Sequence, residues 1–166
     1  MNELDRFVAA QDSEHAGLAD ALDELRAGRK RGHWIWYVFP QLAGLGMSSM
    51  SQRDGLQGRA ETEDYLQHGE LRDRYARAID VVAEHMCRLQ PPPLAVLMGS
   101  EIDARKLVSS LTLFEAVAEG MAARSGDPAL ATLAERIGEV LAAAERQGYE
   151  RCAITLDKLG SSESAG

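Results

Sequence analysis

The sequence predicts an all-α fold organised as one helical domain. Apolar residues recur at three- and four-residue steps over most of the 166-residue chain, which is the spacing of helices with one buried face. The alternation of strands and helices that marks a parallel α/β protein is absent. A chain of this length has the size of a common single domain and can bury a sizeable core. We therefore expect one domain over residues 1–159.

Two short helices are expected before residue 28. Asn2 can cap the first, which carries apolar residues on one side. Ser13 is the expected N-cap of the second. Arg26 falls in the last turn of that helix, where a cation is favoured, and Gly28 supplies the stop.

Residues 33–48 are predicted to form an irregular loop rich in aromatic residues and glycine. The run HWIWYVFPQLAGLG at 33–46 holds four of the chain's nine aromatic side chains, one proline and two glycines. Pro40 ends any helix before it and pushes Phe39 toward extended geometry. One or two helical turns followed by a loop is the favoured interpretation. A short buried strand is the alternative, since periodicity cannot separate the two over so few residues.

Four further helices and a turn are expected in the rest of the chain. A short helix near 59–67 ends at Gly69, and a long one over about 70–89 is terminated by three prolines. After a turn at 94–98, a helix spans 101–120. Asp127-Pro128, an N-cap followed by proline at the first helical position, opens the last helix, which ends at Gly148. The tail over 160–166 is small and polar and is predicted to be disordered.

The charge pattern narrows the possible functions. A net charge of −8 makes general nucleic-acid binding unlikely, because phosphate contacts dominate that kind of affinity. The charge is uneven, however. Residues 26–53 carry five basic side chains and no acidic one, which leaves −13 for the remainder. A basic segment in an acidic protein suits a small anion better than a long polyanion.

No cofactor, metal site or membrane span is predicted. No stretch approaches the ~20 apolar residues of a membrane helix, and the N-terminus is neither a signal nor a transit peptide. A cytoplasmic location is therefore expected. Cys87 and Cys152 fit neither a disulfide framework nor a metal site, and we interpret them as a chance pair of buried thiols. Cys87, among apolar positions, is expected to be inert.

The strongest candidate site begins with the basic residues at 29–31. Lys30 and His33 lead directly into Trp34, and an aromatic face can stack on a nucleobase while a cation binds its phosphate. Simpler explanations exist: cations cap helix ends, and aromatic clusters mark cores more often than stacking platforms. His33 is the one credible general acid or base, because no HExxH or GxSxG motif is present.

A second polar patch lies on the otherwise apolar helix near residues 105–112. Serines within helices often bond only to a carbonyl of the preceding turn, so this patch has a structural explanation as well. Gly44-x-Gly46 could present backbone N–H groups to an anion, but the full GxGxxG fingerprint is missing. The predicted ligand-binding residues are Arg29, Lys30, Trp34, Gln41, Lys106, Ser110 and Thr112, with His33 as the catalytic candidate.

Three segments resemble a known family. They are LDRFVAAQ (4–11), LRAGRKRGHWIWYVFPQLAGLGMSSMS (25–51) and MGSEIDARKLVSSLTLF (98–114). Over roughly residues 4–159 the chain looks like the bacterial domain-of-unknown-function family 1810, whose members are sometimes mislabelled calpastatin. The resemblance implies a small helical bacterial protein and carries no activity. The chain departs from the family pattern at Asp54, where an aromatic is expected before Gly55, and at Gly69, where proline usually follows the histidine.

Three functions of different classes fit these residues. The favoured one is a pocket for a small anionic, nucleotide-like ligand, built from residues 29–48 and the helix at 105–112. Such a protein is either a binder or an enzyme acting on a nucleotide or ADP-ribose-like group with His33 as acid or base. A protein-interaction module would instead expose a flat Trp/Phe/Pro surface. A purely structural domain would bury the aromatic segment and use the basic residues for capping and solubility.

Overall fold

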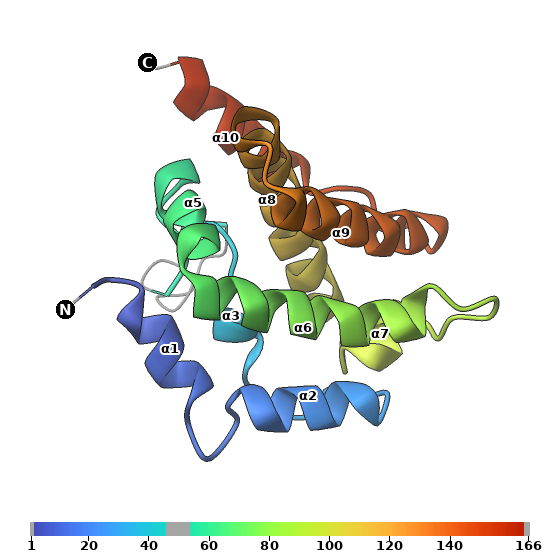
Figure 1. Cartoon of the computed structure of the whole chain (residues 1–166). Helices are drawn as coiled ribbons and strands as arrows, with labels where there is room; N and C mark the ends of the chain where they lie inside the picture. Colours follow the sequence, from blue (N-terminus) through green and yellow to red (C-terminus); the bar gives the residue numbers. More distant parts are fainter. Residues whose placement is uncertain (1, 46–53, 165–166) are drawn as a thin grey trace.

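The computed structural model describes residues 2–45 and 54–164, with side chains as far as residue 161. Over these residues the protein is all-α, as the sequence predicts (Figure 1). The end of the predicted irregular loop, from Gly46 on, and the end of the basic segment, up to Arg53, lie outside the described residues. The helices are α1 (Asp5–Gln11), α2 (Leu18–Arg26), α3 (Ile35–Val38), α5 (Arg59–Gln67), α6 (Gly69–Met86), α7 (Leu94–Leu97), α8 (Glu101–Ser125), α9 (Pro128–Arg146) and α10 (Ala153–Ser164).

The long helix α8 is the element on which α3, α5, α7, α9 and α10 pack. The hydroxyl of Ser100 caps its start by accepting the N–H of Asp103 at 3.1 Å. The predicted end at Gly120 is wrong, and α8 continues to Gly126, which has the left-handed backbone that closes a helix. Asp127 then caps α9 by accepting the N–H of Ala129 at 2.9 Å, as its Asp-Pro pair predicts.

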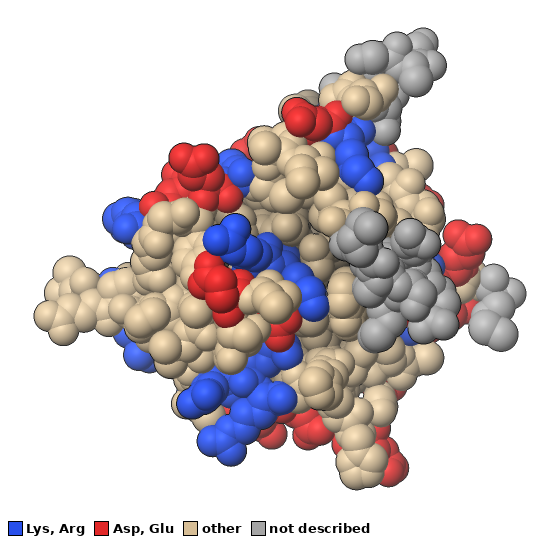
Figure 2. All heavy atoms as spheres, turned by 180° about the vertical axis from the view of Figure 1, so that it is seen from behind, with Lys and Arg blue, Asp and Glu red and all other residues tan. Residues whose placement is uncertain are grey.

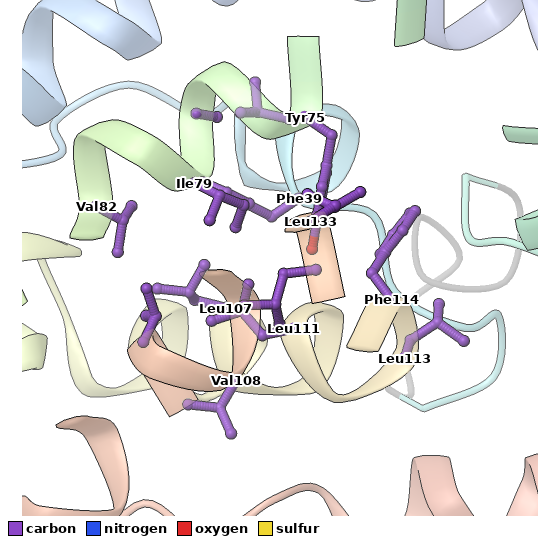
Figure 3. Close-up of a cluster of buried hydrophobic side chains, with 14 of the residues drawn as sticks. Phe39, Tyr75, Ile79, Val82, Leu107, Val108, Leu111, Leu113, Phe114 and Leu133 are labelled. Carbon is purple, nitrogen blue, oxygen red and sulfur yellow. The ribbon is translucent and has the colours of Figure 1, made fainter. Parts of the chain in front are cut away.

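Aromatic rings run through the core between α6 and α8. Tyr75 of α6 stacks on Phe114 of α8 with 4.1 Å between ring centres, and Phe39 meets the edge of Tyr75 at 5.9 Å. Aliphatic side chains of α6, α8 and α9 fill the space beside these rings (Figure 3). Trp34 lies 6.1 Å from Phe39. Part of the aromatic segment is therefore core.

The segment after Trp34 begins with a helical turn, as expected. α3 is one turn long and ends before Pro40, and the chain beyond it is irregular as far as residue 45. A pair of backbone hydrogen bonds then joins this segment to Leu56: the N–H of Ala43 donates to Leu56 at 2.8 Å, and Leu56 donates to Gln41 at 2.8 Å. This isolated bridge between Leu42 and Leu56 is a strand-like pairing, but the described residues of this segment form no strand.

The start of α2 differs from the prediction. The helix begins at Leu18 rather than just after Ser13, and residues 13–17 form a loop. The carboxylate of Asp20 accepts the N–H of Ala16 at 2.8 Å, and Ala16 itself has a positive φ of 55°. The helix therefore starts after this turn, with Gly17 as its N-cap.

The last helix, α10, runs through residues 160–164, where the sequence predicted a disordered tail. Leu159 is buried and Thr155 is fully buried, so this helix is attached to the rest of the domain. The apolar anchors lie before residue 160, and the small residues after them continue the helix. Among the described residues, no helix has both the length and the apolar character needed to cross a membrane.

Candidate functional site

The predicted site residues lie in three places: the interior, the surface and one cleft.

The basic turn at 29–32 is held by Glu24 of α2. Its carboxylate accepts the backbone N–H of Gly32 at 2.6 Å, that of Arg31, and the indole N–H of Trp34 at 3.2 Å. Burial raises the pKa of Glu24, but these hydrogen bonds outweigh it and the pKa is lowered. The backbone N–H groups of Arg31 and Gly32 therefore donate to Glu24 and are not available to an external anion.

Lys30 points into the interior, not to a cleft. Its ammonium pairs with the carboxylate of Asp103 on α8 at 2.8 Å, donates to the carbonyl of Gly32, and lies 5.1 Å from the centre of the Trp34 ring. Its side chain is only 5% exposed. A buried cation of this kind needs its partner to offset desolvation, so the pair fastens the basic turn to α8.

The remaining residues of the predicted basic segment are spread apart. Arg29 and His33 are exposed, and neither lines the cleft described below. Arg26 pairs with Asp23 at 3.6 Å. Acidic residues from α2 and α8 therefore surround a stretch that contains none in its own sequence. The positive charge of the stretch is therefore offset in part, while Arg29 and Arg31 remain exposed.

The aromatic residues also separate by depth. Trp34 and Phe39 have no exposed surface, and Pro40 is buried. The Trp/Phe/Pro surface that a protein-interaction module would expose is therefore not present in the described part of the chain. Trp36 is half-buried, and the ammonium of Lys106 lies 4.1 Å from the centre of its ring.

Trp36 and Lys106 stand at a cleft of about 840 Å³. One wall comes from Trp36 and residues 41–45 with Gly55, the floor from residues 101–109 of α8, and the other wall from residues 147–154. Figure 2 shows the face that carries α8, with a hollow near its centre and Lys, Arg, Asp and Glu side chains around it. A volume of this size is typical of small-molecule sites.

Two of the predicted ligand-binding residues, Gln41 and Lys106, line this cleft. Ser110 and Thr112 do not. Ser110 is fully buried with its hydroxyl 3.0 Å from that of Tyr75, and Thr112 donates to the carbonyl of Val108 at 2.7 Å. Helical geometry explains the division, because Ser109 faces the cleft and its neighbour Ser110 faces the core.

Several cleft residues lie outside the predicted binding set. Trp36 belongs to the predicted aromatic segment but not to that set. Tyr149 and Cys152 are not in the set either, because no sequence pattern links the segment after α9 to α8. Cys87 is exposed, so the prediction of a buried, apolar environment for it is wrong, and Cys152 is half-buried at the cleft.

The charges at the cleft are mixed. Arg105 pairs with Glu101 at 3.2 Å, and Glu101 also accepts the hydroxyl of Tyr149 at 2.6 Å. Lys106 lies 3.5 Å from Asp103, whose other carboxylate oxygen is held by Lys30. Two cations therefore share this one carboxylate.

Comparisons with known proteins show the family of this chain. A family model described as "Protein of unknown function (DUF1810)" matches residues 1–127. The chain is 31% identical to the conserved hypothetical protein Rv1873 from Mycobacterium tuberculosis, whose crystal structure at 1.38 Å superposes with a TM-score of 0.69. That similarity covers 95% of this chain and 96% of the other. A search of curated proteins finds no match. The chain thus belongs to the family of proteins of unknown function called DUF1810, as its sequence motifs predict.

Proposed function

We propose that the cleft between residues 36–45, α8 and residues 147–154 binds a small anionic ligand with a planar group, as a nucleotide has. The observation that carries this proposal is the position of Lys106, 4.1 Å from the centre of the half-buried Trp36 ring at the cleft wall. An aromatic face and a cation side by side suit a base or similar ring joined to a phosphate or carboxylate.

Because Lys30 also pairs with Asp103, Lys106 is available to an anion. Lys30 holds one carboxylate oxygen of Asp103 at 2.8 Å from inside the protein. Lys106 is the more distant partner, at 3.5 Å, and its side chain is 24% exposed. An anionic group in the cleft can therefore pair with Lys106 without leaving Asp103 unpaired.

Neutral groups at the cleft add hydrogen-bonding capacity. The amide of Gln41 and the hydroxyl of Ser109 both line it, and either can donate to an anion or accept from a base. Leu42, Leu45 and Val108 add apolar surface. A few polar groups on a mostly apolar wall are the usual composition of a small-molecule site.

The acidic residues at the cleft limit the size of the ligand. Glu101 and Glu150 line it and are exposed, so a chain of phosphates running past Lys106 would meet negative charge. A mononucleotide or dinucleotide has room to avoid them, whereas DNA and RNA do not. This is consistent with the net charge of −8.

A thermal-unfolding screen tests the proposal. The ligands are ATP, NAD, ADP-ribose and cyclic dinucleotides, with short DNA and RNA as polyanion controls. A ligand at about 100 times its dissociation constant adds roughly 2.7 kcal/mol, which at roughly 2–4 °C per kcal/mol is a shift of roughly 5–10 °C.

Two variants decide whether such a shift comes from the cleft. Lys106→Gln removes the cation and is expected to abolish the shift. Arg88→Gln removes an exposed cation that does not line the cleft and is expected to retain it. A shift that survives Lys106→Gln, or a panel in which nothing shifts the wild-type protein, counts against the proposal.

A further inference from the structure

Cys152 stands directly before α10 and at the cleft. Its carbonyl accepts the N–H of Leu156 at 3.1 Å, so it is the N-cap residue of this twelve-residue helix. Its own N–H donates to the hydroxyl of Thr112 on α8 at 3.0 Å. The guanidinium of the neighbouring Arg151 donates two hydrogen bonds, of 2.8 and 2.9 Å, to the carboxylate of Glu115 on α8. The position of Cys152 relative to the floor of the cleft is therefore fixed from both sides.

The surroundings of the thiol favour its ionised form. The hydroxyls of Ser109 and Thr155 and the backbone N–H groups of Ile154 and Thr155 lie around it. Burial raises the pKa of Cys152, but the donor groups around the sulfur outweigh it and the pKa is lowered. The positive end of the α10 dipole acts in the same direction.

The hydroxyl of Thr155 is one of these groups, and it has no other partner among the described residues. Thr155 has no exposed surface, and its oxygen has no hydrogen-bond partner of ordinary geometry within the described residues. A buried hydroxyl is normally satisfied, and a neutral thiol is only a weak acceptor. A thiolate is a strong acceptor. The hydroxyl of Thr155 can therefore donate a hydrogen bond to Cys152 when its sulfur is ionised.

We propose that Cys152 is the reactive thiol of the cleft and exchanges with small anionic disulfides. This inference rests on the same cleft as the proposed function. The thiolate of Cys152 attacks one sulfur of a disulfide R–S–S–R, and the new sulfur–sulfur bond forms as the old one breaks. The second half leaves as a thiolate and takes up the proton that Cys152 released. One disulfide is consumed and one is made, so no further oxidant is needed.

The composition of the cleft is compatible with this reaction class. A thiolate leaves without a general acid, and no histidine lines the cleft within the described residues. Cys87, the second cysteine of the chain, is exposed and does not line the cleft, so no neighbouring thiol removes the bound half. Lys106, on the same cleft, supplies the cation for a carboxylate of the disulfide.

The first experiment measures thiol reactivity with iodoacetamide, an uncharged reagent. In the Cys87→Ser protein, Cys152 is the sole thiol, and its alkylation is followed by intact mass across a pH series. The expected midpoint lies at lower pH in the folded protein than in the same protein unfolded in urea. Thr155→Val, which keeps the shape of the side chain, is expected to raise the folded midpoint. A folded midpoint at or above the unfolded one overturns the proposal.

The second experiment tests the charge of the disulfide. Mixed-disulfide formation at Cys152 is compared for glutathione disulfide, which is anionic, and cystamine, which is cationic. Lys106→Gln is expected to slow the reaction with glutathione disulfide by about 2–5-fold, the range of a partly exposed charge pair, and to leave that with cystamine unchanged or faster. Equal effects on both reagents overturn the anion preference.

Failure of this inference is distinguishable from failure of the proposed function. Nucleotide-induced stabilisation of the Cys152→Ser protein reports on ligand binding without the thiol. Alkylation by iodoacetamide reports on the thiol without anion binding. A reactive Cys152 in a protein that no nucleotide stabilises would support thiol exchange and reject nucleotide binding. An unreactive Cys152 in a protein that a nucleotide stabilises would support nucleotide binding and reject thiol exchange.

Discussion

Lys30 and Asp103 form an ion pair across the interface between the basic turn and α8, with 2.8 Å between the ammonium and a carboxylate oxygen. Removing one partner of a fully buried pair costs about 3–5 kcal/mol, but Asp103 keeps Lys106 as a second partner at 3.5 Å, so the loss should be smaller here. We expect Lys30→Met to lower the free energy of unfolding by about 1–3 kcal/mol, as measured by urea denaturation. The double variant Lys30→Met, Asp103→Leu should recover much of it, because neither member of the buried pair is then left without the other.

This pair also separates a structural from a ligand-binding role of Lys30. If Lys30 bound a ligand directly, the double variant would lose all ligand-induced stabilisation even where its fold is restored. Retained stabilisation would assign Lys30 to the fold alone.

The carboxylate of Glu24 predicts a dependence of stability on pH. Its pKa is lower in the folded protein than in the unfolded chain, so its contribution is fully present above the unfolded value and is lost as pH falls through the folded value. Glu24→Gln keeps an acceptor oxygen but removes the charge, and should cost about 1 kcal/mol near neutral pH. The difference from wild type should shrink in acid, as followed by urea denaturation between neutral and acidic pH. A difference that stays constant would show that charge is not involved.

Ser110 belongs to the core and not to the cleft, and its variant should show this. Ser110→Ala leaves the buried hydroxyl of Tyr75 without its partner at 3.0 Å, which costs about 1–3 kcal/mol of stability. The double variant Ser110→Ala, Tyr75→Phe should be close to wild type, since neither polar group remains. Any nucleotide-induced shift should be the same in both. Loss of that shift in Ser110→Ala alone would return Ser110 to the binding set.

Trp36 and His33 should differ sharply in ligand binding. Trp36 lines the cleft, whereas His33 is exposed and does not line it. In the Trp34→Phe protein, Trp36 is the sole tryptophan, and a ligand that stacks on it should quench its fluorescence. His33→Ala in that background should leave the quenching curve unchanged, while Lys106→Gln should move it to higher ligand concentration. A weaker affinity in His33→Ala would restore the predicted role of His33.

The sequence was a good guide where local signals decide the structure. Asp127-Pro128 starts α9, because capping and the missing N–H of proline act within a few residues. α6 ends at Met86 rather than near Leu89 as predicted, so the proline run does not end it directly. The end of α8 was harder to predict. Gly120 is tolerated inside the helix, and the left-handed backbone at Gly126 ends it.

The lining of the cleft could be predicted only in part, because its members come from distant parts of the chain. Of the predicted ligand-binding residues, Gln41 and Lys106 line it. Lys30 lies in the interior because it pairs with Asp103, which is more than seventy residues away in the sequence. Cys152 carries no local signal, and its role depends on Ser109 and Thr112 of another helix.

The two walls of the cleft come from opposite ends of the chain and both rest on α8. Because the walls are separate segments, we expect each to open locally with its own free energy. A molecule bound between them would couple these openings into one cooperative unit. Amide hydrogen exchange in α10 would then slow on binding, even at residues that never contact the ligand. α10 would thereby report occupancy of a cleft whose opposite wall, with Trp36 and Gln41, lies more than a hundred positions earlier in the sequence.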